Sequence, residues 1–150
     1  MDQIAFIMPS PGMMFFCKDD MIELLETHDF PKGLYQMLAK WGLKFLTHLP
    51  DMPKGPKVQG AYLDINHGES QIRSMYVPDQ GTYYLVKDFQ KYMRMYLTKC
   101  FEATADEFEG EMTEGQIAGL RQDFESSLKR FCDMIDYMGS EAKRYEVSRN

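Results

Sequence analysis

The stretch that decides the fold is TEGQIAGLRQDFESSLKRFCDMIDYMGSEAKRY, residues 113–145. Within it, apolar side chains recur at every third or fourth position, which is the spacing of one face of an α-helix. These apolar positions are Ile117, Leu120, Phe124, Leu128, Phe131, Ile135, Met138, Ala142 and Tyr145. Thr113 and Gln116 have the spacing of a capping box, which places the start of the helix there. The stretch therefore predicts a long amphipathic C-terminal helix of about 30 residues, roughly 45 Å long. Because this is long for a domain of this size, we expect one of three arrangements: the helix kinks at Gly139, projects beyond the body of the domain, or pairs with a second copy of the chain.

Shorter elements of both kinds precede this helix. Apolar runs bounded by turn residues predict strands at residues 4–8, 13–17, 58–65 and 72–77. Apolar residues at helical spacing predict helices at residues 19–29, 31–49 and 82–104, the last of them capped by Thr82. The sequence Pro9-Ser10-Pro11-Gly12 has type II turn chemistry, so the first two strands should form a hairpin. The element order is ββαα-ββαα, which predicts an α+β fold with a small antiparallel sheet covered by helices.

The length of the chain, 150 residues, fits one domain of ordinary size. Residues 50–57 hold three prolines and one glycine, and this composition is typical of a stiff, extended connector. Each side of the connector is short for an independent domain. We therefore expect residues 1–150 to form a single α+β domain with the proline-rich connector inside it.

The composition is that of a globular protein with an acidic balance. Hydrophobic residues make up 44% and charged residues 27% of the chain, and the formal net charge is −6. A negative balance disfavours a nucleic-acid partner and docking on an anionic membrane. The chain has no run of 18 apolar residues, so we expect no transmembrane helix. Cys17, Cys100 and Cys132 are widely spaced, so we expect reduced thiols. Met1-Asp2-Gln3 lacks the basic residues of a secretory signal, so we expect a cytoplasmic location.

No short catalytic motif is present. The chain has no phosphate-loop or dinucleotide-binding glycine pattern and no zinc-protease, nucleophile-elbow or EF-hand pattern. This favours a non-enzymatic protein without excluding an enzyme, and we expect no cofactor and no metal. The most reactive local cluster is Asp64, His67 and Glu69, in the loop between two expected strands. It is interpreted either as a site for acid–base chemistry or as a polar hairpin turn, and its turn composition favours the second interpretation.

A run of acidic side chains links the last two expected helices. Residues 102–114 hold six acids and no base. The acids are Glu102, Asp106, Glu107, Glu109, Glu111 and Glu114. As a functional surface, this stretch would attract and orient a basic partner, whereas as a solvated connector it would only stabilise the start of the final helix. Tyr137, on the polar side of that helix, is a further candidate contact residue because tyrosine is enriched in interfaces.

Three functions are compatible with these observations. The leading hypothesis is a non-enzymatic protein-binding module, such as an adaptor, an inhibitor or an immunity-type protein, that acts through protein–protein contact as a homodimer. Segregated charge, the long final helix and the lack of a catalytic motif motivate it. The first alternative is a small-ligand sensor with an apolar pocket, for which the candidate lining residues are Trp41, Tyr62, Tyr76 and Tyr84. The second alternative is an enzyme that uses the polar loop described above.

Overall fold

A computed structural model describes residues 13–51, 59–65, 68–107 and 110–147, and these residues form five strands and four helices. The elements follow in the order β1 (Met13–Cys17), α2 (Lys18–Thr27), α3 (Leu34–Thr47), β2 (Gln59–Ile65), β3 (Gly68–Val77), β4 (Gly81–Leu85), α4 (Val86–Glu107), α5 (Glu114–Glu141) and β5 (Arg144–Val147). Residues 4–8, for which the sequence predicts a first strand, lie outside the described residues.

The strands form one sheet in the order β2-β3-β4-β1-β5, and each neighbouring pair is antiparallel. β1 lies between β4 and β5, so that Phe15 is opposite Leu85 on one side and Tyr145 on the other. Strands from much later in the chain therefore occupy both sides of β1. The other strand and the turn of the hairpin that the sequence predicts with residues 13–17 lie outside the described residues, so the hairpin stays a prediction.

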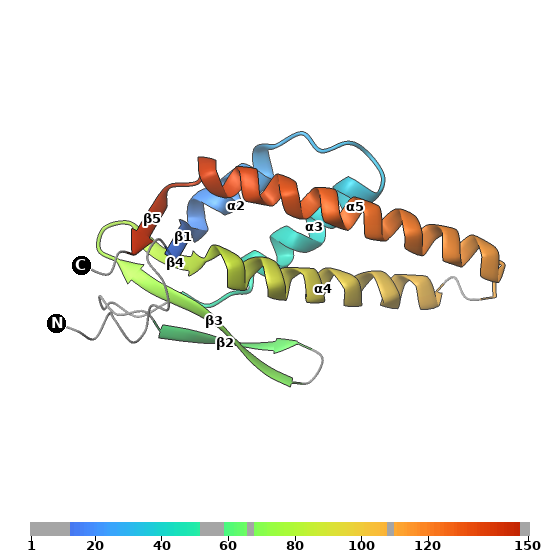
Figure 1. Cartoon of the computed structure of the whole chain (residues 1–150), viewed down its shortest axis with the longest axis horizontal. Coiled ribbons are helices and arrows are strands. Elements are labelled where there is room, and N and C mark those ends of the chain that lie inside the picture. Colours follow the sequence, from blue (N-terminus) through green and yellow to red (C-terminus); the bar gives the residue numbers. More distant parts are fainter. Residues whose placement is uncertain (1–12, 52–58, 66–67, 108–109, 148–150) are drawn as a thin grey trace.

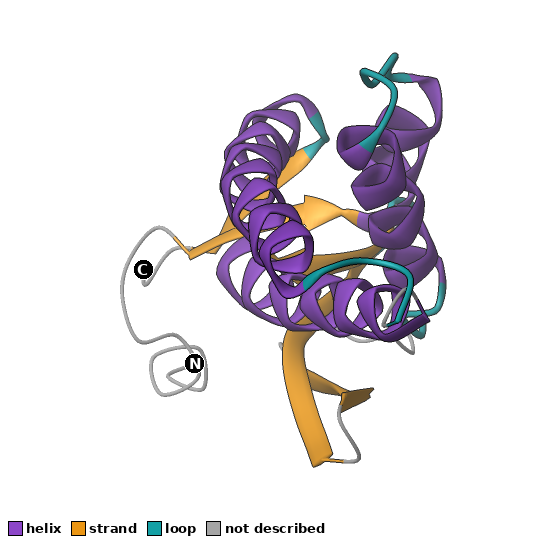
Figure 2. Ribbon diagram, turned by 90° about the vertical axis from the view of Figure 1, so that its right-hand side faces the viewer, coloured by secondary structure: helices purple, strands orange, loops and turns teal. Residues whose placement is uncertain are grey.

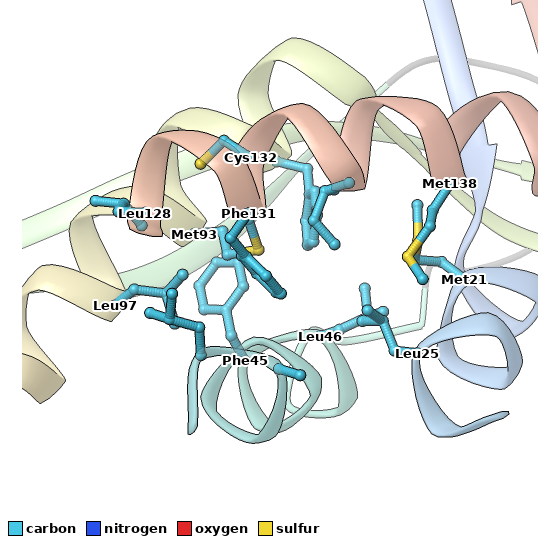
Figure 3. Close-up of a cluster of buried hydrophobic side chains, with 14 of the residues drawn as sticks. Met21, Leu25, Phe45, Leu46, Met93, Leu97, Leu128, Phe131, Cys132 and Met138 are labelled. Carbon is cyan, nitrogen blue, oxygen red and sulfur yellow. The ribbon is translucent and has the colours of Figure 1, made fainter. Parts of the chain in front are cut away.

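The helices pack against one face of the sheet (Figure 2). Their buried side chains form a cluster with Phe16, Ile72 and Tyr84, and side chains of alternating strand positions share this face. Figure 3 shows this core, where side chains of α2, α3, α4 and α5 point toward one another. Gly42 on α3 faces α5, and a Cβ at this position would lie 3.5 Å from the ring of Phe131, an ordinary contact distance.

A buried lysine fixes the path of the chain after α3. The Nζ atom of Lys18 donates a hydrogen bond to the carbonyl oxygen of Leu49 at 2.8 Å and lies 3.0 Å from Oδ1 of Asp51. The hydroxyl of Tyr84 donates to the carbonyl oxygen of Pro50. Leu49 and Tyr84 both belong to the core on the helix-covered face. These contacts hold residues 49–51, where the proline-rich connector begins, on the helix side of the sheet.

The predicted fold class is confirmed, because a small antiparallel sheet is covered by helices and the C-terminal helix α5 has 28 residues. Three boundaries differ from the prediction by four residues, and the first is the start of β3, at Gly68 instead of residue 72. Residues 81–85 form β4 and not the first turn of a helix, since Asp79 and Gly81, with φ of 64° and 109°, turn the chain back beside β3. The final helix ends at Glu141 and does not reach Tyr145, because residues 144–147 pair with β1 as β5.

Candidate functional site

Helices α4 and α5 form an antiparallel hairpin whose far end extends away from the sheet (Figure 1). Part of the way along it, the rings of Phe101 and Phe124 stack with their centroids 4.2 Å apart. Beyond this stack the packing thins, and Ile117 on α5 is only half-buried. The last turns therefore form a projecting end, which we call the hairpin tip and define as residues 102–107 and 110–121.

A capping box fixes the turn of the tip into α5. The Oγ1 atom of Thr113 accepts a hydrogen bond from the backbone nitrogen of Gln116 at 3.1 Å. The backbone nitrogen of Thr113 donates in return to Oε1 of Gln116 at 2.9 Å. The capping box that the spacing predicts is thus confirmed. These two bonds satisfy backbone donors at the start of the helix, so the tip is held by hydrogen bonds as well as by packing.

A groove of about 360 Å³ lies between the end of α4 and the start of α5. Ala105 and Ile117 give it an apolar lining, and Asp106, Glu114 and Arg121 give it charged groups. Long side chains with a charged end bury an apolar stem and keep the charge near water or a counter-charge. The groove therefore offers an approaching side chain both apolar contact and an ionic partner.

One base, Arg121, reaches the acidic surface from α5. Its Nη2 atom lies 2.6 Å from Oε1 of Glu102, and its Nε atom donates to Oε2 at 3.2 Å. These hydrogen bonds lower the pKa of the Glu102 carboxyl. They also raise the pKa of the guanidinium, to which the negative charge of Asp106 contributes. Glu102 therefore has its partner within the chain.

The described part of the tip carries a strong negative charge. Its five acids and one base give a formal charge of −4, since five negative charges and one positive charge are present. Four exposed carboxylates take no part in the ion pair between Arg121 and Glu102, namely Asp106, Glu107, Glu111 and Glu114. Charges on a projecting end face solvent on several sides, so their field extends toward an approaching molecule. Glu109, the remaining acid of the predicted surface, lies outside the described residues.

Tyr137 is exposed but lies away from the tip. Its side chain is 67% exposed on the second half of α5. It follows Glu114 by 23 positions in the same helix, which corresponds to roughly 35 Å along the axis. The structure therefore does not bring Tyr137 together with the acidic candidates, and a compact partner would contact one of the two regions.

The predicted pocket residues lie on one helix and on three strands of the sheet. Tyr84 on β4 is fully buried and its hydroxyl is bound to a backbone carbonyl, so its side chain is part of the core. Trp41 on α3 and Tyr76 on β3 are half-buried and pack against the same core. Tyr62 lies on β2, whose side chains are not described. The small-ligand pocket remains a prediction.

The polar loop cluster is only partly described. Asp64 on β2 is opposite Glu69 on β3 in the strand register. His67 lies outside the described residues, so convergence of the three side chains stays untested. Among the residues that the structure does describe, no group of three or more histidine, cysteine or acidic side chains is arranged to hold a metal ion.

Sequence reasoning missed Arg121 as a member of the site, because it follows Glu102 by 19 positions. The signal that identifies it is the hairpin itself. Two helices joined by a short loop run antiparallel, so that positions at similar distances from the loop become neighbours. The acidic run was visible in the sequence, whereas the base that crosses to it required the tertiary pairing of α4 and α5.

Exposed bases lie on the first half of α4 and on the neighbouring helix α3, namely Lys87, Lys91 and Arg94 on α4 and Lys40 and Lys44 on α3, and we call these five bases the basic patch. The ring contact between Phe45 of α3 and Tyr96 of α4, with centroids 5.2 Å apart, shows that the two helices lie side by side. α4 therefore runs from a basic first half to an acidic last turn.

No protein-family model, curated protein or solved structure matches this chain. Within the described residues, none of the helices combines the length and the apolar character needed to cross a membrane. The function therefore has to be inferred from the arrangement of the residues themselves.

Proposed function

We propose that the protein is a non-enzymatic binding module that contacts a basic surface on a protein partner through the hairpin tip. The observation that supports this most directly is the set of four exposed carboxylates at the hairpin tip, two of which, Asp106 and Glu114, line a groove with apolar side chains. The capping box and the Arg121–Glu102 pair support it further, because they hold the tip in one shape before a partner arrives. A preformed surface loses less conformational entropy on binding than a disordered acidic tail.

The charges at the tip would act mainly on the rate at which the partner associates. Acidic and basic surfaces that face each other steer diffusional encounter, and the effect weakens as salt screens charges beyond about 8 Å at 0.15 M ionic strength. The apolar part of the groove would then slow dissociation, because burial of apolar area does not depend on salt screening. Binding through this tip should therefore weaken with salt without disappearing.

The test is affinity capture from the source cells with three forms of the protein. The tip variant carries Asp106→Asn, Glu107→Gln, Glu111→Gln and Glu114→Gln. The control variant carries Glu23→Gln, Glu26→Gln, Asp133→Asn and Glu141→Gln, four exposed acids away from the tip, and so has the same net charge as the tip variant.

We expect a partner that the wild-type protein and the control variant retain equally, and that the tip variant binds about tenfold less well or worse. Equal capture by the tip variant and the control variant would contradict the proposal. A partner whose contact surface is acidic or apolar, with no lysine or arginine, would contradict it as well.

Self-association is a second candidate, and the basic patch favours it. One chain offers both an acidic tip and a basic surface on the same helix, so two copies related by a two-fold axis would place each tip on the patch of the other copy. Light scattering after size exclusion at several salt concentrations tests this candidate. A dimer that dissociates as the salt concentration rises supports self-association. A monomer at low salt contradicts self-association but leaves the proposed binding of a different protein partner unchanged.

A further inference from the structure

The hairpin of strands β2 and β3 extends beyond the rest of the sheet. Within β3, Ser74–Val77 pair with β4, whereas residues 68–73 pair, among the described residues, with β2 alone. The ladder between the two strands runs without interruption along the whole of β2. In Figure 1 and Figure 2 this hairpin projects away from the helices. Residues 59–65 and 68–73 therefore form a two-stranded unit, which we call the β-ribbon.

A two-stranded ribbon has little stability of its own in water, and further strands or a helix have to cover it. One edge of the β-ribbon has such a partner. The backbone nitrogen of Arg73 donates a hydrogen bond to Oδ2 of Asp88 at 2.9 Å, in the first turn of α4. The other edge is the outer edge of β2, which ends the sheet and has no neighbouring strand among the described residues. Its outward N–H and C=O groups form a template for one more strand.

The sequence of β2 lacks the features with which proteins protect an edge strand. Such protection comes from lysines, prolines, bulges or a very short strand. β2 is seven residues long, has the sequence QGAYLDI, and carries one charged residue, Asp64, without any lysine, arginine or proline. Its uninterrupted register with β3 excludes a bulge. β2 therefore has the length and the composition of a strand that pairs on both sides.

A second copy of β2 fits this edge because the strand is complementary to itself. When two copies lie antiparallel about a two-fold axis at Tyr62, all seven residues are paired and Asp64 is opposite Gly60. The one charge of β2 then faces a glycine and not another charge. On its other side, Asp64 is opposite Glu69 of its own copy. Gly60 is opposite Arg73 of its own copy, so that two acids of one chain share a row with a base of the other.

We infer that the outer edge of β2 pairs with β2 of a second copy, which joins the two β-ribbons into one four-stranded layer across a two-fold axis. The layer supplies each β-ribbon with the additional strands that it needs. This pairing is separate from a contact between the hairpin tip and the basic patch, because it uses the backbone of a sheet edge and no charged helix surface. Salt, which weakens contacts between exposed charges, leaves the strand pairing intact.

The experiment uses the full chain and changes the charge at the two-fold axis, where Tyr62 is opposite Tyr62 of the second copy. The variants are Tyr62→Lys, Tyr62→Glu and, as a control, Gln71→Lys. Gln71 is exposed and lies opposite Tyr62 within the β-ribbon, so the control adds a charge to the same row but one strand away from the axis. Light scattering after size exclusion at high salt gives the mass of each variant and of an equimolar mixture of the two Tyr62 variants.

We expect the wild-type protein and the control to be dimers at high salt. Each Tyr62 variant alone should dimerise about fivefold less tightly or worse, because like charges are then directly opposite, and the mixture should restore the dimer through an opposite-charge pair. A monomeric wild-type protein overturns the inference. A dimer that both Tyr62 variants and their mixture leave unchanged overturns it as well. A dimer that salt alone dissociates overturns it in favour of the hairpin tip and the basic patch.

If a charge at residue 62 unfolds the β-ribbon, amide hydrogen exchange in the wild-type protein decides. Alternate residues of an antiparallel strand direct their N–H groups toward the same edge, so the outward amides of β2 report on the pairing. Protection of these amides that is lost when the dimer is diluted supports the inference. Protection that is missing in the dimer, or that persists in the monomer, overturns it.

Discussion

Replacing Asp88 with alanine should destabilise the protein more than replacing Arg73 with methionine, although the two side chains form one ion pair. The carboxylate of Asp88 accepts three hydrogen bonds from Arg73: from the backbone nitrogen at 2.9 Å, from Nε at 2.8 Å and from Nη2 at 2.8 Å. Asp88 stands in the first turn of α4, and the backbone donor belongs to β3. The aspartate therefore joins the sheet to the start of the helical hairpin.

The magnitudes follow from the exposure of the two side chains. Without Asp88, the backbone N–H of Arg73 in a partly buried position loses its acceptor, which costs about 1–3 kcal/mol. Loss of a negative charge at a helix N-terminus adds about 0.3–1 kcal/mol. The guanidinium is 40% exposed and rehydrates, so loss of the ion pair itself adds about 1 kcal/mol or less. The expected total for Asp88→Ala is roughly 1–5 kcal/mol, against about 1 kcal/mol or less for Arg73→Met, which keeps the backbone hydrogen bond and the helix-terminal charge.

Urea unfolding followed by circular dichroism measures both variants, and the double variant closes the cycle. We expect the double variant to cost about as much as Asp88→Ala alone, because the ion pair is already lost in that single variant. If Arg73→Met costs as much as Asp88→Ala, the side-chain pair and not the backbone contact holds β3 to α4, and the reasoning is refuted.

Three further outcomes are expected from the structure. Gly42→Ala should raise the free energy of unfolding by about 0.5–1 kcal/mol, because helix propensity improves and the added Cβ meets Phe131 at an ordinary 3.5 Å. Gly42→Leu should lower the free energy of unfolding by about 1–3 kcal/mol, and urea titrations measure both variants. Burial raises the pKa of Tyr83 to about 12. The contribution of Tyr83 to the free energy of unfolding is therefore fully present below about pH 10 and is lost as the pH rises toward 12. The urea midpoint of Tyr83→Phe should fall less steeply over that range than the midpoint of the wild-type protein. Thr113→Ala removes the acceptor for the N–H of Gln116 and should cost about 0.5–2 kcal/mol, seen as faster amide exchange at the start of α5 if the cap acts locally.

Patterns with a local cause were predictable from the sequence. The helical stripe of α5 and its cap at Thr113 depend on neighbouring residues only, and the cap and the stripe as far as Met138 are found as predicted. The strand β4 was missed because Leu85 continues the helical spacing of Phe89 and Tyr92, which drew the expected helix toward Thr82. The run of threonine and tyrosines in β4 favours a strand, and this local signal outweighs the spacing once β3 is alongside.

Patterns with a distant cause were not predictable in the same way. Tyr145 lies three residues after Ala142 and so fits the helical stripe, but it belongs to β5 because β1 has a free side. The backbone nitrogen of Cys17 donates to the carbonyl oxygen of Lys143, a contact between the two ends of the described chain. For the candidate site, the acidic run was visible in the sequence, while its ion pair with Arg121 required the return of α5 along α4.

The measurement that tests the central claim most directly is zero-length carbodiimide cross-linking of the protein to its captured partner, followed by peptide mapping. This reagent joins a carboxylate to a lysine only where the two form an ion pair in contact. We predict cross-links from Asp106, Glu107, Glu111 or Glu114 to lysines of the partner, and their loss at high salt. Cross-links confined to acids outside the hairpin tip, such as Glu23, Glu26 or Asp133, would contradict the assignment of the tip as the binding surface.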